Sequence, residues 1–214
     1  MKRLVFALML VMGVVALPTS ASAQLDLSKI GGLFGSRNQQ PVAKVSPYKT
    51  LAENAPSKSE IVGTWRYSNL DLEYLGTNTF ADAALSQVES VACEELRMAG
   101  VTPGSFTITL GKSGKGSIMY GDYAYNGSYT YDSSNARFEL TATADNGATI
   151  KCGGFIKKVN GNLVVMLDAK DALGAFKTIL PELATTTDEG STFEMIYGVV
   201  QSFPGIYISM HYTK

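Results

Sequence analysis

From residue 64 onward, apolar and polar residues mostly alternate with a period of two, which is typical of strands with one buried face. Eight such segments are expected, at about 64–74, 106–110, 118–120, 125–131, 137–142, 150–152, 163–167 and 206–213. Turn residues separate most of them, and Asn146-Gly147 and Asn160-Gly161 suit tight hairpins. Because these connections are short, neighbouring segments in the sequence should be neighbouring strands in the sheet.

A sheet this apolar predicts closure, because an exposed edge strand invites pairing with other chains. Eight strands close into a barrel that is either filled by side chains or wide enough for one small ligand. The sequence therefore predicts a mainly β fold, an eight-stranded antiparallel up-and-down barrel. We expect Trp65, Tyr67 and Asn69 on one face of the first strand, and a bulge at Gly153-Gly154 in the sixth.

Three segments change to a helical period, and they are expected as helices inserted into the barrel. Their approximate ranges are 78–99, 169–180 and 191–203. Asp168 and Asp171 are expected to cap the second helix, and Ser191 with Glu194 forms a capping box for the third. A similar box, the tetrapeptide of residues 57–60, predicts one short helical turn just before the first strand.

The first 23 residues have the pattern of a cleavable export signal. Lys2 and Arg3 precede an apolar run, Leu4 to Leu17, and Ala21-Ser22-Ala23 is a small-residue cleavage site. The run is shorter than the roughly 20 apolar residues of a membrane span, so a retained anchor helix is the less favoured alternative. No cysteine follows the cleavage site, and no second long apolar segment occurs. We expect a periplasmic or extracellular protein that is not a lipoprotein and has no transmembrane span once mature.

Residues 24–56 are expected as a flexible tail, and residues 57–214 as the barrel domain. The tail is polar and interrupted by glycine and proline, with no sustained periodicity. Its apolar start, residues 25–34, is either a loosely ordered terminus or a patch that binds a partner. Removal of the signal leaves 191 of the 214 residues, enough for one domain with a core plus a tail.

Charge and cysteine content narrow the classes of partner. After the signal, 16 basic residues remain against 19 acidic ones, a net charge of about −3. Scattered lysines form no polybasic face, which excludes nucleic acid and anionic lipid as expected partners.

In an oxidising compartment, Cys93 and Cys152 are predicted to form a disulfide. Such a bridge closes a loop of about 60 residues and contributes ~4 kcal/mol; the alternative is two separately buried thiols.

Residues for catalysis are few. His211 is the only histidine, and no strained nucleophile turn accompanies it, so a serine–histidine–acid arrangement is not expected. Histidine–cysteine metal spacing is absent. The segment Lys112–Gly116 resembles a phosphate loop but lacks the strand–loop–helix context, so we interpret it as a hairpin. We therefore predict neither an enzyme nor a bound metal or cofactor.

The aromatic strand residues give the best functional lead. Eight side chains are candidates to line one ligand cavity: Trp65, Tyr67, Phe106, Ile108, Tyr120, Tyr129, Tyr131 and Phe138. Tyrosines provide apolar walls with polar tips, which suits a small apolar or amphipathic ligand. The hypothesis is a binding protein without enzymatic activity. The alternative is a solid barrel, filled by these same side chains, that acts as a structural or protein-interaction module of the cell envelope.

The sequence also resembles a known family. Gly63-Thr64-Trp65 after a short helical turn is similar to the Gly-x-Trp signature of lipocalins. With Ala99–Gly104, Gly127–Asp132 and the late helices, the chain from residue 57 resembles lipocalin-like proteins of unknown function secreted by Gram-negative gut bacteria of the Bacteroides type. The resemblance implies a calycin-type barrel and no established activity. It also implies an arginine near the last strand, packed on the tryptophan, but the last arginine here is Arg137.

Overall fold

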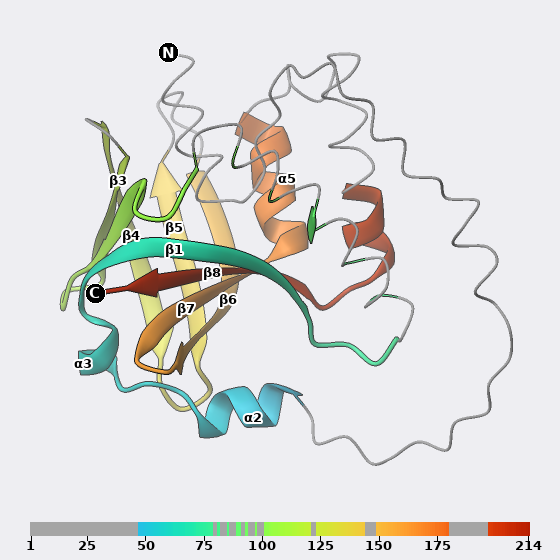
Figure 1. The fold of residues 1–214 in the computed structure, drawn as a ribbon, viewed down its shortest axis with the longest axis horizontal. Helices are drawn as coiled ribbons and strands as arrows, with labels where there is room; N and C mark the ends of the chain where they lie inside the picture. The colour runs from blue at the N-terminus through green and yellow to red at the C-terminus, as the bar shows by residue number, and fades with distance from the viewer. Residues whose placement is uncertain are drawn as a thin grey trace, which may run out of the picture.

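The structure is a computed structural model in which a β-barrel lies beside a group of helices (Figure 1). It describes residues 47–78, 81, 85, 89–90, 93, 97, 101–120, 123–143, 149–179 and 197–214. The predicted signal, the tail up to residue 46, the Asn146-Gly147 turn and the capping box of the third helix lie outside these residues. So does most of the predicted helix 78–99.

Eight antiparallel strands form a closed barrel in which each strand pairs with its neighbours in sequence and β1 pairs with β8. The strands are β1 (Gly63–Tyr74), β2 (Phe106–Leu110), β3 (Lys115–Tyr120), β4 (Tyr123–Asp132), β5 (Arg137–Thr143), β6 (Thr149–Val159), β7 (Asn162–Asp168) and β8 (Ile206–Thr213). The predicted fold class and strand order are confirmed. Alternation was a sufficient signal here because every strand buries one face inside the barrel.

The first strand differs from its prediction in one detail. Its pairing with β8 shifts register between Tyr67 and Asn69, so a bulge reverses the faces of the residues that follow. Leu70 is buried, whereas Asn69 is exposed opposite His211 on the outer face. The expectation that Asn69 shares the inner face with Trp65 was therefore wrong.

The predicted bulge at Gly153-Gly154 is also absent, since β5 and β6 pair without interruption through both glycines. Glycine is needed at position 154 because the backbone of β7 approaches it closely. A Cβ on Gly154 would collide with the carbonyl oxygen of Met166. By contrast, the predicted Asn160-Gly161 hairpin is confirmed. Its two residues have φ of 52° and 84°, the left-handed region that this turn requires.

A short helix, α3 (Lys58–Ile61), closes the end of the barrel at which β1 begins (Figure 1). The Ser57 backbone N–H donates to the Glu60 carboxylate at 2.8 Å, as the capping box predicted. This bond, with help from the Ser57 hydroxyl and Lys158, lowers the pKa of Glu60 to about 2. Directly after the helix, the Trp65 indole N–H donates to the Ile61 carbonyl at 2.8 Å, which ties α3 to the first strand.

A helix that the sequence analysis did not predict, α2 (Pro47–Glu53), packs on the outside of the barrel (Figure 1). Its Leu51 is buried against Phe155, Met166 and Tyr207, which lie on the outer faces of β6, β7 and β8. Residues 47–56 were expected within a flexible tail. They instead cover an apolar strip on three strands, so this part of the tail belongs to the folded unit.

The remaining helices lie at the opposite end of the barrel. Because β7 runs antiparallel to β8 and β8 antiparallel to β1, α5 (Ala169–Ile179) begins where β1 ends. Asp168 caps α5 as predicted, accepting from the backbone N–H groups of Lys170 (2.9 Å) and Asp171 (3.2 Å). Ala172 and Leu173 of α5 join the barrel core.

Parts of the other two predicted helices are visible at the same end. Residues 197–202 are helical, as is each residue described between 81 and 97. Val200 and Leu85 from these segments also join the core. No helix in the described ranges is long and apolar enough to cross a membrane.

Candidate functional site: the barrel interior

The structure brings all eight predicted lining residues together in one hydrophobic cluster inside the barrel. Six are buried, namely Trp65, Tyr67, Phe106, Ile108, Tyr129 and Phe138; Tyr120 and Tyr131 are partly buried and pack against the same cluster. Their convergence follows from the inward alternation on β1 to β5. That they line a ligand site stays a prediction.

Trp65 and Tyr131 close the end of the barrel that α3 covers, which we call the base. The Tyr131 hydroxyl donates to the Pro56 carbonyl at 2.6 Å. The ammonium of Lys214 lies 4.9 Å from the centre of the Trp65 ring. A cation over an aromatic face is an attractive contact. Lys214, directly after β8, thus makes the contact with the tryptophan for which the family resemblance implied an arginine.

The middle of the barrel holds a trio of aromatic rings. Tyr67 stacks on Phe106 with 4.5 Å between ring centres, and Tyr212 meets both rings edge-on at 6.3 and 5.9 Å. Tyr212 was not among the predicted lining residues. Its position on the inner face was readable, however, because the last strand alternates and Tyr212 shares the phase of Met210.

A second aromatic pair, Tyr129 and Phe138, lies 5.8 Å apart between ring centres on β4 and β5. The Tyr129 hydroxyl donates to the Gly111 carbonyl at 2.7 Å, and its backbone N–H donates to the Gly114 carbonyl at 2.7 Å. Tyr129 therefore holds the β2–β3 hairpin against β4, and its hydroxyl is already hydrogen-bonded within the protein.

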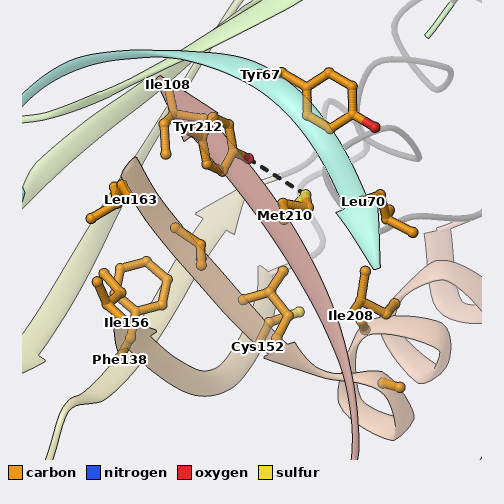
Figure 2. Close-up of a cluster of buried hydrophobic side chains, with 14 of the residues drawn as sticks. Tyr67, Leu70, Ile108, Phe138, Cys152, Ile156, Leu163, Ile208, Met210 and Tyr212 are labelled. Carbon is orange, nitrogen blue, oxygen red and sulfur yellow. Dashed lines mark hydrogen bonds between the residues drawn. The ribbon is translucent and has the colours of Figure 1, made fainter. Parts of the chain in front are cut away.

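The hydroxyl of Tyr212 has a weaker partner. It lies 3.5 Å from the Met210 sulfur, a contact drawn as a dashed line in Figure 2. A thioether is a weak acceptor, yet this side chain is only 1% exposed. Burial, followed by the nearby Tyr67, raises the pKa of Tyr212. Burial, followed by Cys93 and Asp71, raises the pKa of Tyr67 to about 12. Both phenols are therefore protonated at neutral pH and able to donate.

The described interior carries no charge. In the described ranges the only buried polar side chain is Ser209, which lies opposite Asp71 and Met166 on the outer face. At the end that the helices cover, Asp168 is half-buried, and burial, followed by the neighbouring Asp171, raises its pKa despite its bonds to backbone N–H groups. The chemistry available inside the barrel is thus apolar contact plus a few phenolic donors.

The predicted disulfide is not formed in the structure, which has Cys93 and Cys152 as thiols. The Cys93 sulfur donates to the Leu70 carbonyl at 3.7 Å, and Cys152 is buried in the core. Their charged neighbours also differ: burial and Glu89 raise the pKa of Cys93, whereas burial and Asp171 raise the pKa of Cys152 to about 12. The structure therefore agrees with the alternative of two separate thiols.

His211 lies on the outer face of β8, away from the aromatic trio. Its Nε2 is 2.8 Å from an oxygen of Asp71, at an angle outside the range of a hydrogen bond, so the contact is an ion pair when the ring is protonated. Asn69 donates to the other oxygen of the same carboxylate at 2.9 Å. The expected surface or satisfied histidine is thus only partly realised, because Nε2 is buried and has no hydrogen-bond partner among the described residues.

Residues 37–214 match a protein family described as a lipocalin-like domain. The chain belongs to this family. The match agrees with the closed eight-stranded barrel, and it begins upstream of α2, so the family unit includes the helix that covers the outer strip. Comparison with curated proteins and with solved structures found no match.

Proposed function

We propose that this lipocalin-like protein is an exported binding protein, without enzymatic activity, that holds a small apolar or amphipathic molecule inside its barrel. The enclosed interior offers aromatic and aliphatic walls from all eight strands. Such walls with few polar groups are typical of small-molecule sites. Export rests on the signal pattern of residues 1–23.

One observation favours a ligand over a solid barrel: the hydroxyl of Tyr212. A buried hydroxyl without a good acceptor destabilises the folded state, and phenylalanine would fill the same space without that cost. Among the residues that the structure describes, Tyr212 has only the Met210 sulfur as an acceptor. A molecule with an oxygen acceptor, placed against the aromatic trio, gives the hydroxyl the partner that it lacks.

The alternative, an interaction module with a solid barrel, requires a contiguous exposed apolar patch. In the part of the chain that the structure describes, the exposed large apolar side chains are Tyr48, Met119 and Val159. They lie on three different elements, α2, β3 and β6. Single exposed apolar residues of this kind are normal on soluble proteins, so these three do not favour that function.

Native mass spectrometry of the protein purified from its own host tests the proposal. A reproducible bound mass is expected, and Phe106→Trp should abolish it because the larger ring fills the space beside Tyr67 and Tyr212. Met119→Trp, at an exposed position on β3, is the matched control and should keep the bound mass. Circular dichroism verifies that both variants fold. A wild-type protein that is free of ligand under gentle conditions contradicts the proposal.

A further inference from the structure

We propose that the barrel selects ligands whose polar group is an uncharged hydrogen-bond acceptor, such as an ester, ketone or amide carbonyl, and rejects carboxylates. This inference rests on the proposed function and specifies its ligand class. It follows from the charges around the interior and from the donors inside it.

The part of the interior that the structure describes has no cation that would pair with an anionic ligand. Among the lysines and arginines whose side chains the structure describes, all are exposed except Lys157 and Lys158. These two already pair with acids, Lys157 with Glu73 at 2.6 Å and Lys158 with Glu60 at 3.3 Å. An ionised carboxylate moved from water into such a site loses its hydration and gains no opposite charge, which disfavours its binding strongly.

Several of the described charged groups near the phenols and the helix-covered end are acidic. Glu89 lies beside β1, where its carboxylate accepts from the Leu72 N–H at 3.0 Å. Asp71 lies on the outer face beside His211 and is the last of the groups that raise the pKa of Tyr67, after burial and Cys93. Asp168 is half-buried at the start of α5, where Asp171 and the basic Lys170 are both exposed. The partly buried Glu89 and Asp168 therefore disfavour an anionic head group at this end of the barrel.

The described polar groups inside the barrel are phenols, each of which can donate one hydrogen bond. Tyr67 and Tyr212 are protonated at neutral pH, and neither hydroxyl is bonded to a described oxygen or nitrogen acceptor. Tyr129 and Tyr131 differ, since backbone carbonyls already accept from their hydroxyls. A ligand acceptor beside Tyr212 gives its hydroxyl a stronger partner than the Met210 sulfur.

The test compares dodecanoic acid with methyl dodecanoate, which share one chain and differ in charge. The affinity of each compound is measured by its displacement of the neutral fluorescent probe N-phenyl-1-naphthylamine from the folded protein, at pH 8 and at pH 5. At pH 8 the ester should bind more than about 1,000-fold more tightly than the acid, because the acid must first be protonated and its pKa lies near that of glutamate, about 4.3. At pH 5 the gap should shrink to about tenfold or less, with the ester unchanged.

Two variants test whether the Tyr212 hydroxyl contributes to the binding of the ester. Tyr212→Phe removes only the hydroxyl and should weaken ester binding about fivefold, the effect of one neutral hydrogen bond. Tyr207→Phe removes a buried phenol on the outer face, and it should leave ester binding unchanged. Equal loss in both variants would overturn the assignment of the donor to Tyr212.

The remaining outcomes separate this inference from the proposed function. If the acid binds at pH 8 as tightly as the ester, the inference is wrong although the barrel binds a ligand. If neither the probe nor any member of the pair binds, and the protein from its host is also free of ligand, the proposed function fails and the inference fails with it.

Discussion

The contact between α2 and the barrel predicts a large effect from a single residue outside the barrel. Leu51 is 6% exposed and packs on the apolar strip formed by Phe155, Val164, Met166 and Tyr207. Leu51→Ala removes this contact and leaves a cavity. Core substitutions of this kind cost roughly 2–5 kcal/mol. Because α2 lies on the surface and can move closer to the strip to fill the cavity, we expect a loss of stability at the lower end of this range, about 2 kcal/mol.

Urea denaturation followed by tryptophan fluorescence measures this change. Trp65 is the only tryptophan and is buried at the base, so its emission reports unfolding of the barrel. With a denaturant slope of about 2 kcal/mol per molar urea, the midpoint should fall by about 1 M. If α2 were a flexible tail, as the sequence suggested, the midpoint would not move.

Lys49→Ala is the matched control on the same helix. Lys49 lies 3.7 Å from Glu53, and both side chains are largely exposed, so the pair contributes less than about 0.5 kcal/mol. A Leu51→Ala variant that is no less stable than Lys49→Ala would refute the packing of α2 on the barrel.

Three further predictions concern single residues. Gly154→Ala places a methyl group against the Met166 carbonyl, so thermal unfolding should show a loss of about 3 kcal/mol or a failure to fold, and a normal melting curve would contradict this. Lys214→Ala should cost about 0.5–1 kcal/mol and shift the emission of Trp65, whereas unchanged emission would argue against the cation–ring contact. The pKa of Glu60 is lowered from 4.5 to about 2, so its stabilisation is present above pH 4.5 and lost as the pH falls through 2. Glu60→Gln should therefore have a flatter stability profile between pH 5 and pH 2 than the wild type, and parallel profiles would count against the bond.

The sequence predicted the barrel because most strands repeat one local rule, an apolar residue at every second position. The hairpin at Asn160-Gly161 and the cap at Asp168 were also readable, since each depends on a few adjacent residues. The eight candidate lining residues converge for the same reason. Inner-face residues of neighbouring strands must meet once the barrel closes.

What could not be predicted depends on partners far apart in the sequence. The need for glycine at position 154 arises from Met166 on the next strand, and Leu51 becomes a core residue only because an apolar strip faces it. The bulge after Tyr67 exchanges the roles of Asn69 and Leu70 without changing the overall alternation. The weak bond of the Tyr212 hydroxyl was likewise invisible, because it depends on which side chains surround that hydroxyl in space.

A crystal structure of the protein with the molecule that it retains from its host tests the central claim most directly. The account predicts electron density inside the barrel against Phe106, with an uncharged oxygen acceptor within hydrogen-bonding distance of the Tyr212 hydroxyl. A molecule bound on the outer face, or an interior in which Tyr212 keeps Met210 as its partner and no ligand is present, would contradict it.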